Sequence, residues 1–101
     1  LLHNRRAEVA LKFINERLQH SPNDSRLYKL QAQSYADLGN NLLQHRAQAE
    51  AYARQGNLPA AIEQLQIALK SFDGDFYQLS SAEARLKELR ELDANQKLRS
   101  H

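Results

Sequence analysis

Cysteine, methionine and tryptophan are absent from the 101-residue sequence, and glycine (3) and proline (2) are scarce. Without cysteine the chain can form no disulfide and no thiolate metal site. Because helix-breaking residues are few and the 42% hydrophobic fraction consists mostly of alanine and leucine, the composition favours helix over strand. A chain this short has room for one hydrophobic core, so we expect a single domain over residues 1–101.

A large charge surplus and a long apolar run are also missing. Fourteen Lys and Arg stand against 12 Asp and Glu, a net charge of +2, and the cations form no stripe that could follow phosphates, so we expect no nucleic-acid partner. No run approaches the roughly 18 consecutive apolar residues of a membrane span, and no apolar signal stretch opens the sequence. We therefore expect no membrane insertion. Because helical periodicity begins at once without an initiating Met, we also expect a fragment of a larger protein.

A segment of ten residues recurs after 17 positions. QAQSYADLGN at 31–40 is echoed by QAEAYARQGN at 48–57, and 17 residues suffice for a helix of about four turns and a tight turn. Two such units make the 34-residue hairpin of a tetratricopeptide repeat (TPR). In each unit the glycine, Gly39 or Gly56, suits a left-handed helix end, and the following asparagine suits a turn or N-cap. The sequence therefore predicts an all-α, TPR-like stack of antiparallel helical hairpins, a fragment of a right-handed superhelix. A generic antiparallel bundle is the alternative.

The periodicity gives about five helices. Pro22 ends the first of them, and in the fourth the apolar stripe Ile62, Leu65, Leu69 and Phe72 is expected to be buried. Residues 93–101 are polar and are expected to fray. The expected helices cover residues 4–19, 24–38, 41–55, 58–72 and 75–92.

Small residues stand where two TPR helices would cross closely, in one frame of the sequence. The matching positions are Ala49, Tyr52, Gly56, Ala61, Leu65 and Ala68. A partial earlier frame overlaps this one, so the third helix would serve two hairpins. We expect a local change in superhelix curvature there, or an inserted helix that is not part of a repeat.

The second half of the chain resembles a particular family. GNLPAAIEQLQIALK at 56–70, GDFY at 74–77 and EARL at 83–86 are similar to the C-terminal TPR region of bacterial periplasmic zinc metalloproteases of the outer-membrane β-barrel assembly-enhancing type. The resemblance implies a periplasmic location and an N-terminal protease domain with a His-Glu-x-x-His zinc motif, which this sequence lacks. It further implies a regulatory interaction module for outer-membrane protein assembly and quality control. The implied partners are its own protease domain, outer-membrane assembly components or client proteins.

No constellation of residues suggests catalysis, so we expect no enzyme within this chain. Zinc needs ligands brought to one point, whereas His3, His20, His45 and His101 are scattered. Ser80 and Ser81 have no histidine near them in sequence, as nucleophilic catalysis would require. We therefore assign no catalytic, cofactor-binding or metal-binding residue, and we expect zinc only in the absent protease domain. The sequence does not indicate an oligomeric state.

Two sets of residues are candidates for binding. A peptide groove is expected on the second and third helices, where cations could pair with a peptide carboxylate; its residues would be Arg26, Lys29, Gln33, Arg46 and Glu50. A surface that docks the module onto its protease domain is expected on the last helix, at Phe76, Tyr77, Glu83 and Arg85. For both sets the competing interpretation is structural, with solvated charges and with Phe76 and Tyr77 packed on the preceding hairpin. The alternative function is a free-standing TPR adaptor that binds peptide termini through Arg26 and Lys29.

Overall fold

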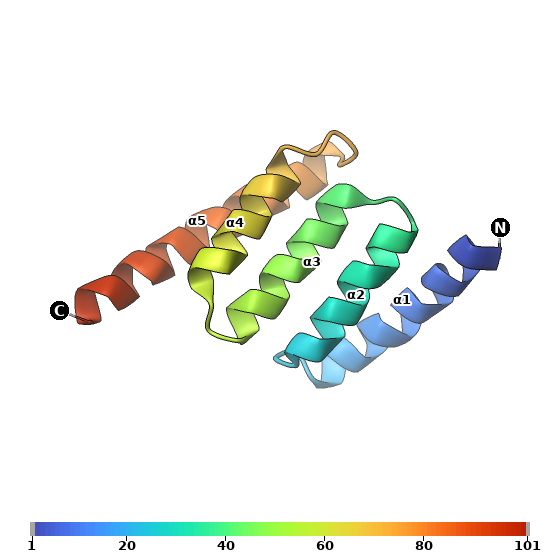
Figure 1. The fold of residues 1–101 in the computed structure, drawn as a ribbon, viewed down its shortest axis with the longest axis horizontal. Coiled ribbons are helices and arrows are strands. Elements are labelled where there is room, and N and C mark those ends of the chain that lie inside the picture. Colours follow the sequence, from blue (N-terminus) through green and yellow to red (C-terminus); the bar gives the residue numbers. More distant parts are fainter. Residues whose placement is uncertain (1, 101) are drawn as a thin grey trace.

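The computed structural model describes residues 2–100, with side chains from Asn4 onward. Within these residues the chain forms five α-helices and no strand, namely α1 (Leu2–His20), α2 (Ser25–Asp37), α3 (Asn41–Arg54), α4 (Leu58–Leu69) and α5 (Phe76–Arg99). Helices α1 to α4 lie side by side with alternating direction, and α5 lies behind α4 (Figure 1). The folded chain measures 52 × 30 × 18 Å. The predicted all-α stack of antiparallel helical hairpins is confirmed.

The 17-residue echo marks two copies of one helix-ending turn. Gly39 has φ +76° and Gly56 has φ +81°, the left-handed conformation that glycine adopts at little steric cost. The N–H of Asn40 donates to the carbonyl of Tyr35 at 2.9 Å, and the N–H of Asn57 donates to that of Tyr52, also at 2.9 Å. Together with a bond from each glycine N–H, these bonds form a Schellman motif that satisfies the last carbonyls of α2 and α3.

Polar side chains begin three of the helices. Asp24 accepts from the N–H of Arg26 at the start of α2, and Asn57 accepts from Ala60 at the start of α4. Asp75 forms a capping box with Gln78, in which the backbone N–H of each residue donates to the side chain of the other. These caps satisfy N–H groups that have no partner within the helix, so they fix where each helix begins.

The core is centred on α3, α4 and α5. Its fully buried small residues, Ala49, Ala61 and Ala82, let the helix backbones approach closely, and Leu65 and Leu89 fill the space between them. The small positions of the predicted repeat frame are therefore buried as expected. His45 of α3 forms a 2.8 Å hydrogen bond with Gln64 of α4.

Helix α3 belongs both to the hairpin that it forms with α2 and to the hairpin that it forms with α4. It packs against α2 and α4, and it also contacts α5, as expected when one hairpin stacks on the next helix. On the other side of α3, within the described residues, α1 reaches only α2 and does not contact α3. The first three helices thus continue as a flat layer, which agrees with the irregularity predicted from the overlapping repeat frames.

Two expectations about the second half were wrong. Phe72 is not buried but fully exposed, because α4 ends at Leu69 and the chain then turns so that Asp73 can reach the first N–H groups of α3. Residues 93–99 are not frayed but belong to α5. No glycine or proline follows Asp93 to end the helix, and an i,i+4 ion pair of 3.1 Å joins Asp93 to Lys97. Residue 101 lies outside the described residues.

Candidate functional site: a groove on α2, α3 and α5

A groove of about 370 Å³ runs along α3 between α2 and α5. We call it the α2–α3–α5 groove, and it is lined by Tyr28, Gln31, Tyr35, Leu43, Arg46, Ala47, Glu50, Ser81, Ala84, Arg85 and Glu88. It exists because α3 and α5 belong to successive layers of the stack, while α2 lies beside α3 in the flat part of the fold. The joint between the regular and the flat halves therefore forms the groove.

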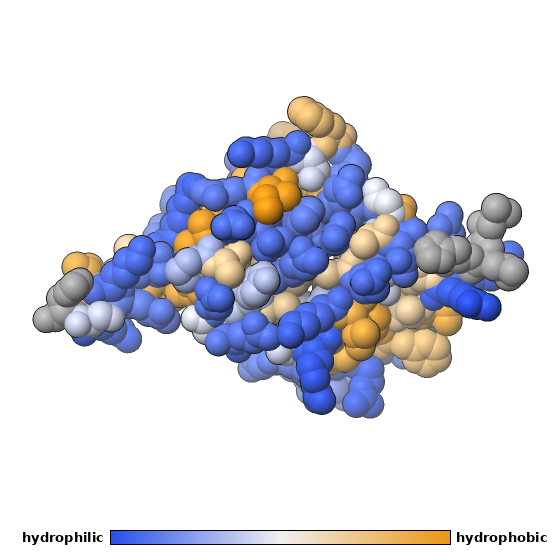
Figure 2. Space-filling model, viewed as in Figure 1, coloured by the Kyte–Doolittle hydropathy of each residue, from blue (hydrophilic) through white to orange (hydrophobic). Residues whose placement is uncertain are grey.

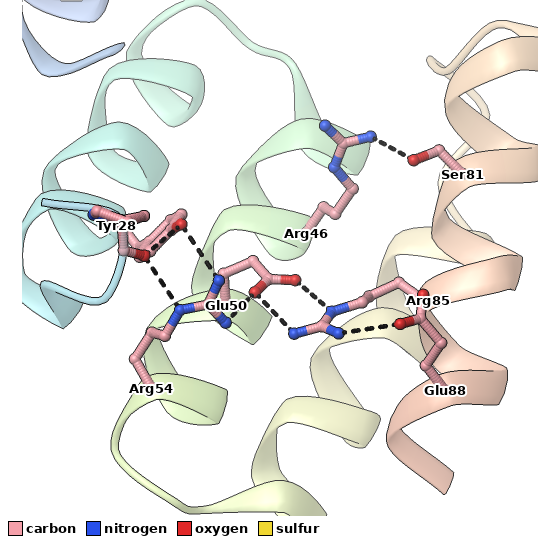
Figure 3. A network of polar contacts seen from close by, with 8 residues as sticks. Tyr28, Arg46, Glu50, Arg54, Ser81, Arg85 and Glu88 are labelled. Atoms are coloured by element: carbon pink, nitrogen blue, oxygen red, sulfur yellow. Dashed lines mark hydrogen bonds and ion pairs between the residues drawn. The ribbon is translucent and has the colours of Figure 1, made fainter. Parts of the chain in front are cut away.

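Glu50 lies at the centre of a polar network in this groove (Figure 3). Its carboxylate accepts two bonds from Arg85 of α5, at 2.6 Å from Nε and 3.1 Å from Nη2, and a third of 2.7 Å from Arg54 Nη1. Only 18% of the Glu50 side chain and 25% of each arginine side chain are exposed. Bidentate pairs of this kind are the strongest arginine–carboxylate contacts. The hydrogen bonds to Glu50 raise the pKa of Arg85 above its usual value, outweighing the desolvation that lowers it.

Arg54 extends the network to the first two helices. Its guanidinium lies over the ring of Tyr28, 5.1 Å from the centroid, in a cation–π contact. Arg54 Nε donates to the carbonyl of Pro22 at 3.1 Å, and the hydroxyl of Tyr28 donates to the same carbonyl at 2.9 Å. The turn between α1 and α2 is thereby linked to α3, and Glu50 links α3 in turn to α5.

Arg46 differs from the other arginines of the site. Arg46 Nη1 donates a 3.2 Å hydrogen bond to the hydroxyl of Ser81, and among the described residues no carboxylate pairs with Arg46. Arg46, Arg54 and Arg85 stand against Glu50 and Glu88, a surplus of one positive charge. Because Glu50 is shared by Arg54 and Arg85, and Glu88 lies 3.5 Å from Arg85, that surplus falls at Arg46.

Of the five predicted groove residues, the structure brings Arg46 and Glu50 together. Arg26 lies outside the groove with 84% of its side chain exposed, and it pairs with Asp24 at 3.2 Å. That hydrogen-bonded pair lowers the pKa of Asp24 below its usual value. Lys29 lines a separate hollow with Gln48, Ala51, Tyr52, Gln55 and Gln64, and Gln33 bonds to Asp37 within α2.

The predicted α2 residues and the α2 residues that line the groove lie on different sides of the helix. Positions 26, 29 and 33 have the same i, i+3, i+7 spacing as positions 28, 31 and 35, which do line the groove. Either set is a possible helix face. The two tyrosines at positions 28 and 35, seven residues apart, are the sequence signal that could have indicated the side that lines this groove.

The four predicted docking residues do not form one surface. Arg85 lies in the groove with Glu50, whereas Glu83 lines a hollow on another side of α5 with Leu69, Leu86, Lys87, Arg90, Glu91 and Ala94. Phe76 and Tyr77 are 85% and 80% exposed at the start of α5, so they do not pack on the preceding hairpin. Phe72, which was expected in the core, is also exposed and lies close to them in the chain.

Among the described residues, no group of three or more His, Cys, Asp or Glu side chains is placed to hold a metal ion. No helix in this part of the chain is both long enough and apolar enough to cross a membrane.

Compared with known proteins, the chain matches no protein-family model, no curated protein and no solved structure.

Proposed function

We propose that this chain is a non-catalytic protein-interaction module whose α2–α3–α5 groove binds a carboxylate-bearing segment of a partner protein. The observation that supports this most is the guanidinium of Arg46, which lies on the groove wall with a neutral hydroxyl as its partner. Arginine has five N–H donors in a planar fork that matches a carboxylate. Because one donor goes to Ser81, the others can hold a ligand.

The rest of the groove is suited to positioning such a segment. Glu50 and Arg85 satisfy each other, and Tyr28 is held by its bond to Pro22 and by Arg54. A groove whose own side chains are already fixed loses less conformational entropy when a ligand binds. Tyr35, among the other lining residues, adds aromatic surface of the kind enriched at interfaces.

The resemblance of residues 56–86 to periplasmic zinc metalloproteases supports a narrower form of the proposal. In that form the chain is the regulatory TPR module of such a protease and acts in outer-membrane protein assembly and quality control. Its partners are its own protease domain, outer-membrane assembly components or client proteins in the periplasm. Zinc belongs to the protease domain, and this chain needs no cofactor.

The alternative, a free-standing adaptor for peptide termini, loses the pair on which it was based, since Arg26 and Lys29 do not line the groove. Arg46 could still bind a terminal carboxylate as well as a side-chain one. Amidating the C-terminus of a bound peptide distinguishes the two: the adaptor loses its ligand, whereas a module that reads an internal Asp or Glu keeps it.

Site-specific photo-crosslinking in cells tests the proposal. A photoreactive residue at Ala84, which is exposed on the groove wall, is expected to capture the protease domain or an envelope protein. The same residue at Lys29, in the separate hollow, is the matched control and is expected to capture neither. Equal crosslinking at both positions would reject the groove as the binding site. Capture of cytosolic chaperones alone would reject the envelope role.

A further inference from the structure

Three aromatic side chains project into solvent at one end of the molecule. Phe72 in the α4–α5 loop is fully exposed, and Phe76 and Tyr77 at the start of α5 are 85% and 80% exposed. We call these residues, with Asp73 and Asp75 between them, the aromatic tip. Figure 2 shows the hydrophobic atoms protruding above the α4–α5 loop. Apolar groups gathered in this way on a small protein commonly mark a contact surface.

The loop that carries the aromatic tip is held in place on both sides of Gly74. The carboxylate of Asp73 accepts from the N–H groups of Asn41 and Leu42 at the start of α3. Gly74 lies so close to Leu42 that a Cβ at this position would overlap the leucine Cδ1. Asp75 forms the capping box of α5. The aromatic rings are therefore presented by a fixed loop, so a partner need not order it.

A second exposed apolar surface lies at the opposite edge of the stack, on α1. Val9 is 51% exposed and Phe13, one turn later on the same side, is 64% exposed. Arg5, Arg6, Val9 and Ala10 line an open and largely apolar hollow. We call these five residues the α1 patch. It joins apolar surface to two cations, whereas the aromatic tip joins apolar surface to two carboxylates.

The two surfaces cannot meet within one chain. Helix α1 contacts α2 and no other helix of the described part, and the α4–α5 loop lies at the far side of α3 from it (Figure 1). Their charges are opposite and both are apolar, so they are complementary between two copies. We propose that the aromatic tip of one copy of this chain docks on the α1 patch of a second copy, with Asp73 and Asp75 facing Arg5 and Arg6.

The contact is heterologous, because it joins two different surfaces. Each bound pair leaves one tip and one patch free, so the association continues into short open chains rather than stopping at a two-fold dimer. Aromatic side chains bury about 150–250 Å² each, so three supply roughly 500 Å², below the roughly 800 Å² per partner of a standard stable interface. We accordingly expect a weak association.

Sedimentation equilibrium of the full chain tests the proposal, with two double variants that change exposed residues only. The tip variant carries Phe72→Ser and Phe76→Ser, and the patch variant carries Val9→Ser and Phe13→Ser. The wild-type mass is expected to rise with concentration above that of the 11.6-kDa monomer. Each variant alone is expected to weaken association by about tenfold or more. An equimolar mixture of the two is expected to form a 1:1 heterodimer and nothing larger, since one intact tip and one intact patch remain.

Other results would overturn the proposal. If the wild-type chain stays monomeric at millimolar concentration, it does not form this contact. If that monomer binds phosphatidylcholine vesicles through Phe72, the aromatic tip is a lipid-binding element instead. If the tip variant is monomeric while the patch variant still dimerises, the contact is a pairing of two aromatic tips. Association unchanged in both variants would place the interface elsewhere. An Arg46→Ala chain is expected to associate like the wild type, because this contact is independent of the α2–α3–α5 groove.

Discussion

Glu50 of α3 and Arg85 of α5, 35 positions apart, share two hydrogen bonds of 2.6 and 3.1 Å across the joint between successive layers of the stack. The same carboxylate holds Arg54, whose guanidinium covers Tyr28 of α2. One side chain thus connects the three helices that form the groove. Losing it affects both the stability of the joint and the shape of the groove.

Replacing Glu50 by Gln removes the charge that two arginines share. We expect the free energy of unfolding to fall by about 1–3 kcal/mol, because two largely buried arginines then lack a negative charge to pair with. The partial exposure of the three side chains keeps this loss below that of a fully buried pair. Urea denaturation followed by circular dichroism measures it. Glu88→Gln is the matched control, because Glu88 is 63% exposed, and a change within about 0.5 kcal/mol is expected. Equal losses in the two variants would contradict the role given to Glu50.

Gly56→Ala places a Cβ on a residue with φ +81°. Nothing lies within 4 Å of that Cβ, so the cost is the backbone conformation alone, about 1–2 kcal/mol of unfolding free energy. Thermal denaturation gives the value. Gly56→Asn is expected to lose less than the alanine variant, since asparagine tolerates the left-handed region. An alanine variant as stable as the wild type would show that the Schellman turn is not formed in solution.

Asp73 gives the fold a pH dependence of known sign. Desolvation raises its pKa, but the hydrogen bonds from the N–H groups of Asn41 and Leu42 outweigh it, so the pKa lies below its usual value in the folded chain. A carboxyl with a lowered folded pKa stabilises the protein above its unfolded pKa of about 3.9, and this stabilisation is lost as the pH falls through the folded pKa.

The Asp73→Asn variant checks this sign. It keeps an acceptor for the α3 N–H groups but has no charge to titrate, so its stability is expected to fall less steeply than that of the wild type as the pH drops from about 5 toward 3. Denaturation midpoints at several pH values measure the two slopes. Parallel slopes would mean that the carboxylate of Asp73 does not interact with the start of α3.

How much of the fold the sequence predicts depends on whether the signal is local. The echo of Tyr, Gly and Asn predicted two identical turns, because the left-handed glycine and the carbonyls that its turn satisfies lie within six residues of the chain. The extent of α4 was not predicted. The apolar spacing continues to Phe72, so the sequence predicts a longer helix. The chain turns away after Leu69 because Asp73 accepts hydrogen bonds from the start of α3, at residues 31 and 32 positions earlier in the sequence.

The groove was only half predicted for the same reason. Arg46 and Glu50 stand four positions apart on α3, so they lie on one side of their own helix, and local spacing alone brings them together. On α2 the buried residues Ala32 and Ser34 leave two possible exposed sides, and which one faces the groove is decided by the positions of α1 and α3. Arg85 was predicted to be a docking residue, with a solvated charge as the alternative, because its partner Glu50 is distant in sequence.

Calorimetric titration of an acidic peptide into the wild-type chain, Arg46→Ala and Lys29→Ala tests the central claim most directly. A carboxylate held by Arg46 predicts salt-sensitive binding to the wild type, a loss of about tenfold or more in affinity for Arg46→Ala, and wild-type affinity for Lys29→Ala, whose side chain lines the separate hollow. If Arg46→Ala binds the peptide as tightly as the wild type, or if Lys29→Ala is the variant that loses it, the α2–α3–α5 groove is not the binding site.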